Sequence, residues 1–192
     1  MNPPTTLLRL AREGFDYRHW YEQARDEIAH CCMLQRWDPN RFTDILAITS
    51  PRVAVRRNVR LTIGYMMTGR LPEDVIRSTH AALAHYEETG EIRGPKTSAF
   101  GAALKGDLDA VVLDTWMARA LGVPHSAFGK RRIRESAARR IRFTAHLAGL
   151  MPAQMQAAVW AGAVKRAGRN VPGIHVSEEL YSPLIPVTKE IV

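Results

Sequence analysis

Apolar residues recur every three or four positions along most of the chain, and this period limits the folds open to it. In residues 16–33, Trp20, Ala24, Ile28 and Cys32 follow that spacing, which would place them on one face of a helix. Alternation with a period of two, the sign of a half-buried strand, is rare. The sequence therefore predicts an all-α fold, built as a compact helical bundle.

Proline, glycine and acidic residues divide this pattern into successive helices. A short apolar helix should hold Ile45 and Ile48, and Pro51 should follow its end. Further helices are expected over residues 52–67, 71–88, 96–106, 115–121, 126–148 and 152–167. We expect one helical domain over residues 1–170, followed by an extended C-terminal tail over residues 171–192 with prolines at positions 172, 183 and 186.

The chain is strongly basic. Among its 192 residues, 27 are Lys or Arg and 19 are Asp or Glu, which gives a formal net charge of +8. This charge fits a phosphate-rich partner, because neutralised phosphates release counterions, although solubility alone is the simpler alternative. The expected helix 126–148 carries seven of the cations: Lys130, Arg131, Arg132, Arg134, Arg139, Arg140 and Arg142. Either they form a solvated face or, as we predict, they contact the phosphates of double-stranded DNA.

The cysteine content is two adjacent residues, Cys31 and Cys32. Neighbouring cysteines do not readily form a disulfide, and these two lack the spacing of metal ligands. We therefore expect no metal, no iron–sulfur cluster and no other cofactor. The sequence shows no signal-peptide pattern and no apolar run of membrane-spanning length, so we expect a cytoplasmic location without membrane association.

The strongest chemical signal is a lysine and an aspartate eighteen residues apart, Lys96 and Asp114. Lys96 follows Gly94 at an expected helix start, and Asp114 follows the apolar run 111–113 at the next one. This arrangement can bring both side chains to one cleft, where a helix N-terminus and Arg93 would lower the pKa of the lysine. A deprotonated amine is a nucleophile, and a nearby carboxylate stabilises the cationic sugar that forms as a base departs.

Each of these residues also has a plain structural interpretation. Lys96 taken alone fits an exposed lysine in a first helical turn, and Asp114 taken alone fits a helix N-cap. Trp116 fits the core beneath Asp114, and its functional alternative is to stack on an extruded base. The joint occurrence of the lysine, the apolar run and the aspartate favours the functional interpretation.

The run from Gly94 to Asp114 resembles the helix-hairpin-helix superfamily of DNA glycosylases. Members with lyase activity carry a hairpin that ends in Gly-x-Lys, then an apolar strip, then a catalytic aspartate, and Gly94, Lys96 and Asp114 stand in those places. The resemblance implies that Lys96 attacks the sugar carbon to form a Schiff base and that Asp114 assists departure of the base. It covers residues 44–121, and the segment 151–160 is similar to phage and actinobacterial relatives.

The resemblance and the basic helix together predict a surface that contacts DNA. Its predicted residues are Arg52, Arg56, Asn58, Arg93, Gly94, Arg131 and Arg134, and Trp116 is predicted to line the base pocket. The hairpin departs from the family pattern at two positions. Ile92 stands in place of the first hairpin glycine, and Glu91 adds a negative charge beside it.

Three functions follow as hypotheses. The first is a monomeric DNA glycosylase for repair or modification, which extrudes a nucleotide and cleaves its N-glycosidic bond, with lyase activity through Lys96. The second is a transferase on the same scaffold that hypermodifies bases in DNA. The third is a non-catalytic DNA-binding protein. In each case the expected location is the nucleoid or the cytoplasm of a phage-infected host.

Overall fold

The computed structural model describes residues 1–181, and every regular element in that range is a helix. The all-α prediction is therefore confirmed for the described residues. The α-helices are α1 (Pro4–Glu13), α2 (Trp20–Gln35), α3 (Pro39–Thr49), α4 (Val55–Thr68), α5 (Arg77–Thr89), α6 (Pro95–Leu104), α7 (Thr115–Leu121), α8 (Arg131–Ala148), α9 (Pro152–Arg166) and α10 (Val176–Tyr181). Two short 3-10 helices, η1 (Phe15–Tyr17) and η2 (His125–Gly129), precede α2 and α8.

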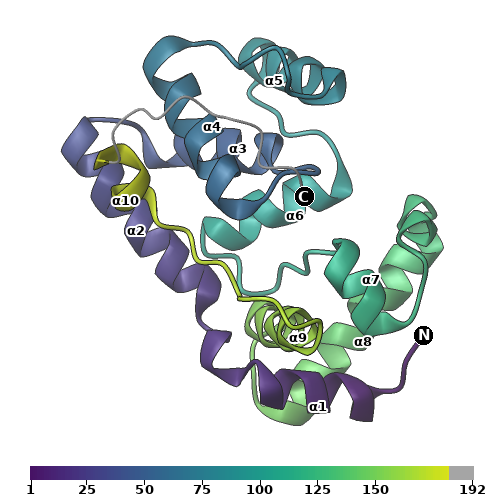
Figure 1. Cartoon of the computed structure of the whole chain (residues 1–192). Coiled ribbons are helices and arrows are strands. Elements are labelled where there is room, and N and C mark those ends of the chain that lie inside the picture. Colours follow the sequence, from purple (N-terminus) through teal and green to yellow (C-terminus); the bar gives the residue numbers. More distant parts are fainter. Residues whose placement is uncertain (182–192) are drawn as a thin grey trace.

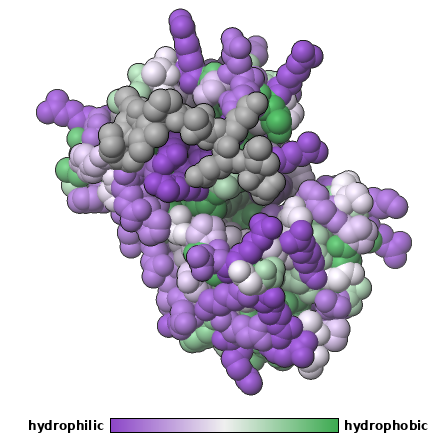
Figure 2. Space-filling model, viewed as in Figure 1, coloured by the Kyte–Doolittle hydropathy of each residue, from purple (hydrophilic) through white to green (hydrophobic). Residues whose placement is uncertain are grey.

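The helices form two groups, each around its own apolar core (Figure 1). The α9 lobe consists of α1, α7, α8 and α9, and its core includes Leu7, Met117 and Ile141. The α3 lobe consists of α3, α4, α5 and α6, and its core includes Phe42 and Leu104. Helix α2 runs beside both groups (Figure 1). Figure 2 shows a mostly hydrophilic face that is hollowed between the two lobes.

Two glycines allow α1 to lie directly on α9. A Cβ atom at Gly162 would come within 2.0 Å of the carbonyl oxygen of Leu10, and one at Gly14 within 2.1 Å of that of Ala158. Both obstacles are backbone atoms, which a small side-chain movement cannot relieve. The close approach of these backbones fixes α1 on the helix that forms one wall of the candidate site.

The apolar run 111–113 connects the lobes as an extended segment between α6 and α7. Val111 and Leu113 pack into the core of the α9 lobe, whereas Val112 packs into the core that includes the α3 lobe. Alternate side chains of an extended chain point in opposite directions, so one short strip can contribute to both cores. It ends at Asp114, whose carboxylate caps α7 as predicted, with Oδ1 accepting a hydrogen bond of 2.8 Å from the Met117 amide.

Several predicted boundaries differ from the structure. The helix predicted over 71–88 begins only at Arg77, because residues 72–75 form a turn in which the amide of Val75 bonds to the Pro72 carbonyl. The basic helix predicted over 126–148 begins at Arg131, after η2. The helix expected over 16–33 begins at Trp20, after η1.

The C-terminal segment, which we define as residues 168–181, also differs from prediction. An extended tail was expected from residue 171, but α10 forms within it, and Ile174 and Val176 are buried in the core beside α2. The part of the predicted tail that carries Pro183 and Pro186 lies outside the described residues. Within residues 1–181, none of the helices has the length and apolar character needed to cross a bilayer.

Polar contacts hold this segment against α2 and α4. The carboxylate of Glu27 accepts hydrogen bonds from the amide of Ser177, at 2.9 Å, and from its hydroxyl. Glu179 is almost fully buried and pairs with Arg56, at 2.5 Å, and with Arg60. The indole of Trp20 donates to the Pro172 carbonyl at 2.8 Å, so the segment passes directly over this tryptophan.

Candidate functional site

Two hollows share Lys96 as a lining residue. The basic groove, of about 790 Å³, runs between the lobes and is lined by cations that include Arg93, Arg134, Arg139 and Arg142. The aromatic pocket, of about 590 Å³, is lined by Trp20, Tyr21, Phe100, Trp116 and Trp160 together with Asp114. Lys96 lines both hollows. The structure therefore brings Lys96 and Asp114 to one pocket, with a basic groove beside it.

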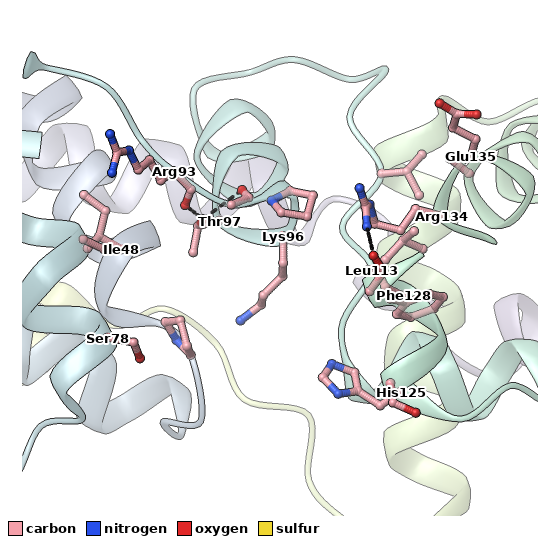
Figure 3. Close-up of a pocket in the computed structure, with 18 of the residues that line it drawn as sticks. Ile48, Ser78, Arg93, Lys96, Thr97, Leu113, His125, Phe128, Arg134 and Glu135 are labelled. Atoms are coloured by element: carbon pink, nitrogen blue, oxygen red, sulfur yellow. Dashed lines mark hydrogen bonds between the residues drawn. The ribbon is translucent and has the colours of Figure 1, made fainter. Parts of the chain in front are cut away.

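Lys96 occupies the first turn of α6 because the hairpin before it can turn sharply. Gly94 has a φ of 99°, a conformation that residues with a Cβ rarely adopt, and it serves as the N-cap of α6. The hydroxyl of Thr97 donates to the carbonyls of Arg93, at 2.5 Å, and Gly94, at 2.9 Å, and so closes the turn. Figure 3 shows the Lys96 side chain extending from this turn into the space between the two walls of the groove.

The amine of Lys96 is held at the end of α3. Its Nζ donates to the hydroxyl of Ser50, at 3.1 Å, and to the Ser50 carbonyl, at 3.4 Å. Burial lowers the pKa of Lys96 from its usual value, and the charge of Asp114 acts in the opposite direction. The net decrease increases the fraction of neutral, nucleophilic amine at neutral pH.

Asp114 is half-buried at the end of the strip that joins the lobes. Burial raises the pKa of its carboxyl, while the Met117 amide and the charge of Lys96 limit the increase. A carboxyl whose pKa is raised and an amine whose pKa is lowered therefore act on each other across the same pocket. Opposed shifts of this kind are typical of groups that exchange protons during a reaction.

The aromatic pocket is built from rings that pack on one another. The ring of Trp20 lies 5.1 Å from Tyr21, 5.6 Å from Trp160 and 6.3 Å from Phe100, measured between centroids. Trp116 is half-buried and lines the pocket. Trp20 belongs to the apolar core and Trp160 packs against it, and both also line the pocket, a position that helical spacing alone does not reveal.

Guanidinium groups flank Trp116. The Arg119 guanidinium lies 4.5 Å from its ring centroid, and that of Arg169 lies 5.7 Å away. Arg169 belongs to the C-terminal segment and also lines the pocket. Cations over an indole face fix its orientation and add positive potential at the pocket rim.

The predicted DNA-contact residues fall into three sets. Arg93, Gly94 and Arg134 line the basic groove, although Arg134 also donates to the carbonyls of η2 and so fixes that turn. Arg52 is exposed at the aromatic pocket, and its φ of 59° is left-handed, a rare conformation for a residue with a Cβ. Arg131 lies outside the lining of both hollows and pairs with Glu135 at 2.6 Å.

The last two residues predicted to contact DNA, Asn58 and Arg56, also make contacts within the chain. Asn58 is buried, with its Oδ1 accepting from the Thr49 hydroxyl at 2.7 Å and its Nδ2 donating to the Leu46 carbonyl at 2.9 Å. These hydrogen bonds join α3 to α4, and Asn58 also lines the aromatic pocket, so its contact with DNA stays a prediction. Arg56 lines the aromatic pocket and pairs with Glu179, a contact made by the helix that the sequence did not predict.

The residues that sequence reasoning missed are Tyr21 and Gln156. Both line the aromatic pocket, and both are buried. Nothing in the local sequence marks a buried glutamine as a pocket residue. Among residues 1–181, no cluster of three or more His, Cys, Asp and Glu side chains could hold a metal ion.

Together, fold and site define a class: a chain, all-helical over residues 1–181, with a half-buried lysine and a half-buried carboxylate at an aromatic pocket beside a basic groove. Residues 12–167 match the model of DUF7178, described as a family of unknown function, and the chain belongs to this family. No curated protein and no solved structure matches the chain. The matched range includes Lys96, Asp114 and Gln156, whereas the C-terminal segment lies beyond it.

Proposed function

We propose that this chain is a DNA-binding enzyme of the helix-hairpin-helix glycosylase type, which extrudes a nucleotide and cleaves its N-glycosidic bond. One observation carries the proposal: Lys96 lies where a basic groove meets an aromatic pocket that contains Asp114. A sugar at that junction would have its phosphates in the groove and its base in the pocket. The motif around Gly94, Lys96 and Asp114 supports the same chemistry.

The groove is suited to a phosphodiester backbone. Its cations come from both lobes, with Arg93 on the hairpin before α6 and Arg139 and Arg142 on α8. Each phosphate that such groups neutralise releases counterions, which favours binding at low salt. Cations on opposing walls would hold a backbone that passes between them.

The pocket is suited to an extruded base. Its indole and phenyl rings offer faces on which a heterocycle can stack. Extrusion costs a few kcal/mol of lost stacking and pairing, which these contacts and the phosphate contacts would offset. In this proposal Arg52, which is exposed in the loop after α3, would occupy the space that the base leaves.

The reaction can be written with these two side chains. The neutral Nζ of Lys96 attacks C1′ of the deoxyribose, the bond from C1′ to the base nitrogen breaks, and its electron pair leaves with the base. Asp114 stabilises the positive charge on the sugar, accepts a proton from the attacking nitrogen and passes it to the departing base. The nitrogen lone pair then opens the sugar ring, whose oxygen takes up a proton, and a Schiff base remains.

The proposal is tested by incubating the protein with duplexes that each contain one damaged or modified base. Free base and abasic DNA are measured for the native chain and for the variants Lys96→Ala, Asp114→Asn and Lys130→Ala. At saturating protein we expect base release from at least one duplex and a loss of about a hundredfold or more in the first two variants. We expect no change in this rate for Lys130, an exposed lysine outside both hollows, because a phosphate contact there would affect binding and not the bond-breaking step. No base release across the whole panel would contradict the proposal.

A second candidate, a transferase that modifies bases in DNA, is favoured by the size of the pocket. Its volume of about 590 Å³ lies within the ~300–1,000 Å³ range of sites for drug-sized ligands, which leaves room for a substituent or second substrate. This candidate predicts a mass change on the DNA without abasic product, and dependence on Asp114. Salt-sensitive binding with no chemistry of either kind would instead indicate a non-catalytic DNA-binding protein.

A further inference from the structure

Gln156 combines deep burial with an unused hydrogen-bond donor. Gln156 is only 2% exposed, yet it lines the aromatic pocket. Its Oε1 accepts a hydrogen bond of 2.7 Å from the Tyr21 hydroxyl, whereas its Nε2 makes no hydrogen bond to any residue in the described range 1–181. This Nε2 is not among the fully buried side-chain atoms of residues 1–181 that lack a partner, so it borders the pocket, where a ligand or water can accept its hydrogen bond.

The direction of this amide is fixed by its neighbour. Burial raises the pKa of Tyr21 well above its usual value, and the charge of Asp114 adds to the increase, so the phenol stays protonated and donates its hydrogen. The hydrogen bond from Tyr21 occupies Oε1, and Nε2 is the amide group that remains for a ligand in the pocket. The site therefore presents a donor and not an acceptor at this point.

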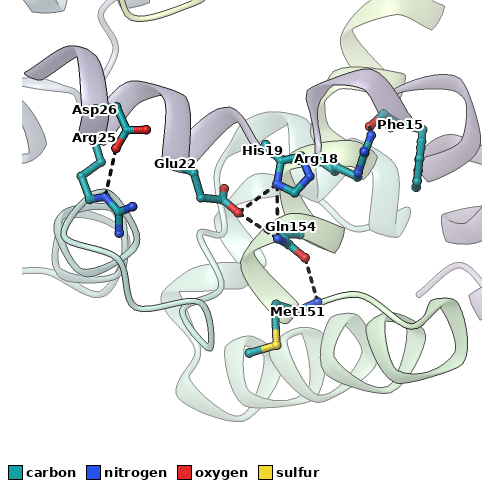
Figure 4. Close-up of polar contacts among 8 residues, drawn as sticks. All are labelled: Phe15, Arg18, His19, Glu22, Arg25, Asp26, Met151 and Gln154. Carbon is teal, nitrogen blue, oxygen red and sulfur yellow. Dashed lines mark hydrogen bonds and ion pairs between the residues drawn. The ribbon is translucent and has the colours of Figure 1, made fainter.

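A separate polar network holds the two helices that carry this pair. The carboxylate of Glu22 on α2 accepts from Gln154 of α9 at 2.8 Å and contacts the His19 ring at 3.1 Å (Figure 4). The side-chain oxygen of Gln154 in turn accepts from the Met151 amide at 3.2 Å. Because Tyr21 and Gln156 are close neighbours of these residues in sequence, the network keeps the phenol and the amide in register.

The same helix supplies a stacking surface. Trp160 follows Gln156 by four residues, which places both side chains on one face of α9, and both line the pocket. A planar ring against the indole would have its edge within reach of the amide. Recognition of an extruded base by stacking combined with edge hydrogen bonds has this form.

We propose that Gln156 is a specificity-determining residue that donates from Nε2 to a carbonyl oxygen on the edge of an extruded base. This inference rests on the proposed function and narrows its substrate class. The preferred base would carry a keto group at the position where the other base of the same ring size carries an amino group. An amino group at that position is itself a hydrogen-bond donor. It would therefore bring two donors face to face and leave Nε2 of Gln156 without an acceptor.

The test compares four duplexes that differ only in one bulged base: thymine, cytosine, guanine or adenine. A bulged base is extruded at low cost. Thymine and guanine carry a keto group at the position where cytosine and adenine, respectively, carry an amino group. We expect the native chain to prefer the keto member of at least one pair by about five- to tenfold in Kd. Gln156→Met should abolish this preference, and Gln156→Glu, which replaces the donor by an acceptor, should reverse it.

Two controls separate recognition from folding and from DNA binding. Thermal melting identifies a variant that does not fold, and Tyr21→Phe, which frees the amide to rotate, should weaken the preference in a folded chain. Equal affinity for keto and amino bases in the native chain, or a preference that Gln156→Met leaves intact, would overturn the inference while the glycosylase proposal stands. No binding to any of the four duplexes would overturn both.

Discussion

At the scale of single residues, Lys96 and Asp114 are linked by opposite pKa shifts. Burial lowers the pKa of the amine and raises that of the carboxyl, and the attraction between their charges opposes both shifts. Removing one charge must therefore move the pKa of the other group further from its usual value. The pair can be examined through pH dependence, which a purely structural lysine would not show.

The first prediction concerns the acidic limb of the pH–rate profile. In the native chain, the rate of the Lys96 reaction should rise with pH as the amine loses its proton. Asp114→Asn removes a charge that raises the pKa of Lys96, so the limb should move to lower pH while the maximum rate falls. Single-turnover rates across the pH range measure both effects, and a limb that does not move would show that the two groups do not interact.

The second prediction concerns stability. Because the folded-state pKa of Asp114 is raised, the folded chain binds more protons than the unfolded chain between the two pKa values, and stability decreases as pH rises through that interval. Asparagine keeps the N-cap without the buried charge. Asp114→Asn should therefore be more stable than the native chain by about 1 kcal/mol at neutral pH, with a smaller difference near pH 4. Urea unfolding at both pH values measures the difference, and destabilisation at neutral pH would contradict it.

At the scale of elements, α10 depends on contacts distant in sequence. Burial alone would raise the pKa of Glu179, but hydrogen bonds from Arg60 and Arg56 outweigh it and lower the pKa. This stabilisation is present above the unfolded-state pKa of the carboxyl and is lost as pH falls through its folded-state value. The pairing with Arg56 and Arg60 holds α10, and residues of the stretch just before this helix, Arg169 to Ile174, line the aromatic pocket.

The third prediction follows from this contact. Glu179→Gln should weaken the C-terminal segment by about 1–2 kcal/mol and increase hydrogen exchange in residues 168–181. The matched control is Glu178→Gln, which makes the same charge change on an adjacent, exposed residue and should cost less than about 0.5 kcal/mol. Equal exchange in the two variants would show that Glu179 does not hold α10.

Local chemistry accounts for what the sequence predicted among these elements. The cap at Asp114 and the turn at Gly94 depend on neighbouring residues, and they formed as expected. Helix α10 was missed because its contacts come from α2 and α4, which no local pattern reveals. The pocket positions of Tyr21 and Gln156 were missed for the same reason: a cavity is a property of packed helices and not of one helix face.

At the scale of the whole molecule, the site lies between the two lobes. Lys96 belongs to the α3 lobe, while Asp114 ends the strip that contributes side chains to both cores. The basic groove likewise takes cations from both sides. Separation or rotation of the lobes would change groove and pocket together, so DNA binding and chemistry should be coupled.

The fourth prediction tests the groove by salt dependence. Arg139→Ala combined with Arg142→Ala removes two cations from the groove and should reduce the slope of log K against log salt by about 1.8, as two phosphate contacts would require. The control removes two cations from α1, Arg9 and Arg12, which do not line the groove, and its slope should match that of the native chain. Equal slopes in both double variants would place the DNA elsewhere on the surface.

The central claim, that Lys96 is a nucleophile at an interlobe pocket for DNA, is tested most directly by borohydride trapping on an abasic duplex. Reduction converts a Schiff base into a stable amine, and mass spectrometry of the digested adduct identifies the attached residue. We predict an adduct on Lys96 that is absent in Lys96→Ala and retained in Lys130→Ala. An adduct on another residue, or none with a duplex that the chain binds, would contradict the claim.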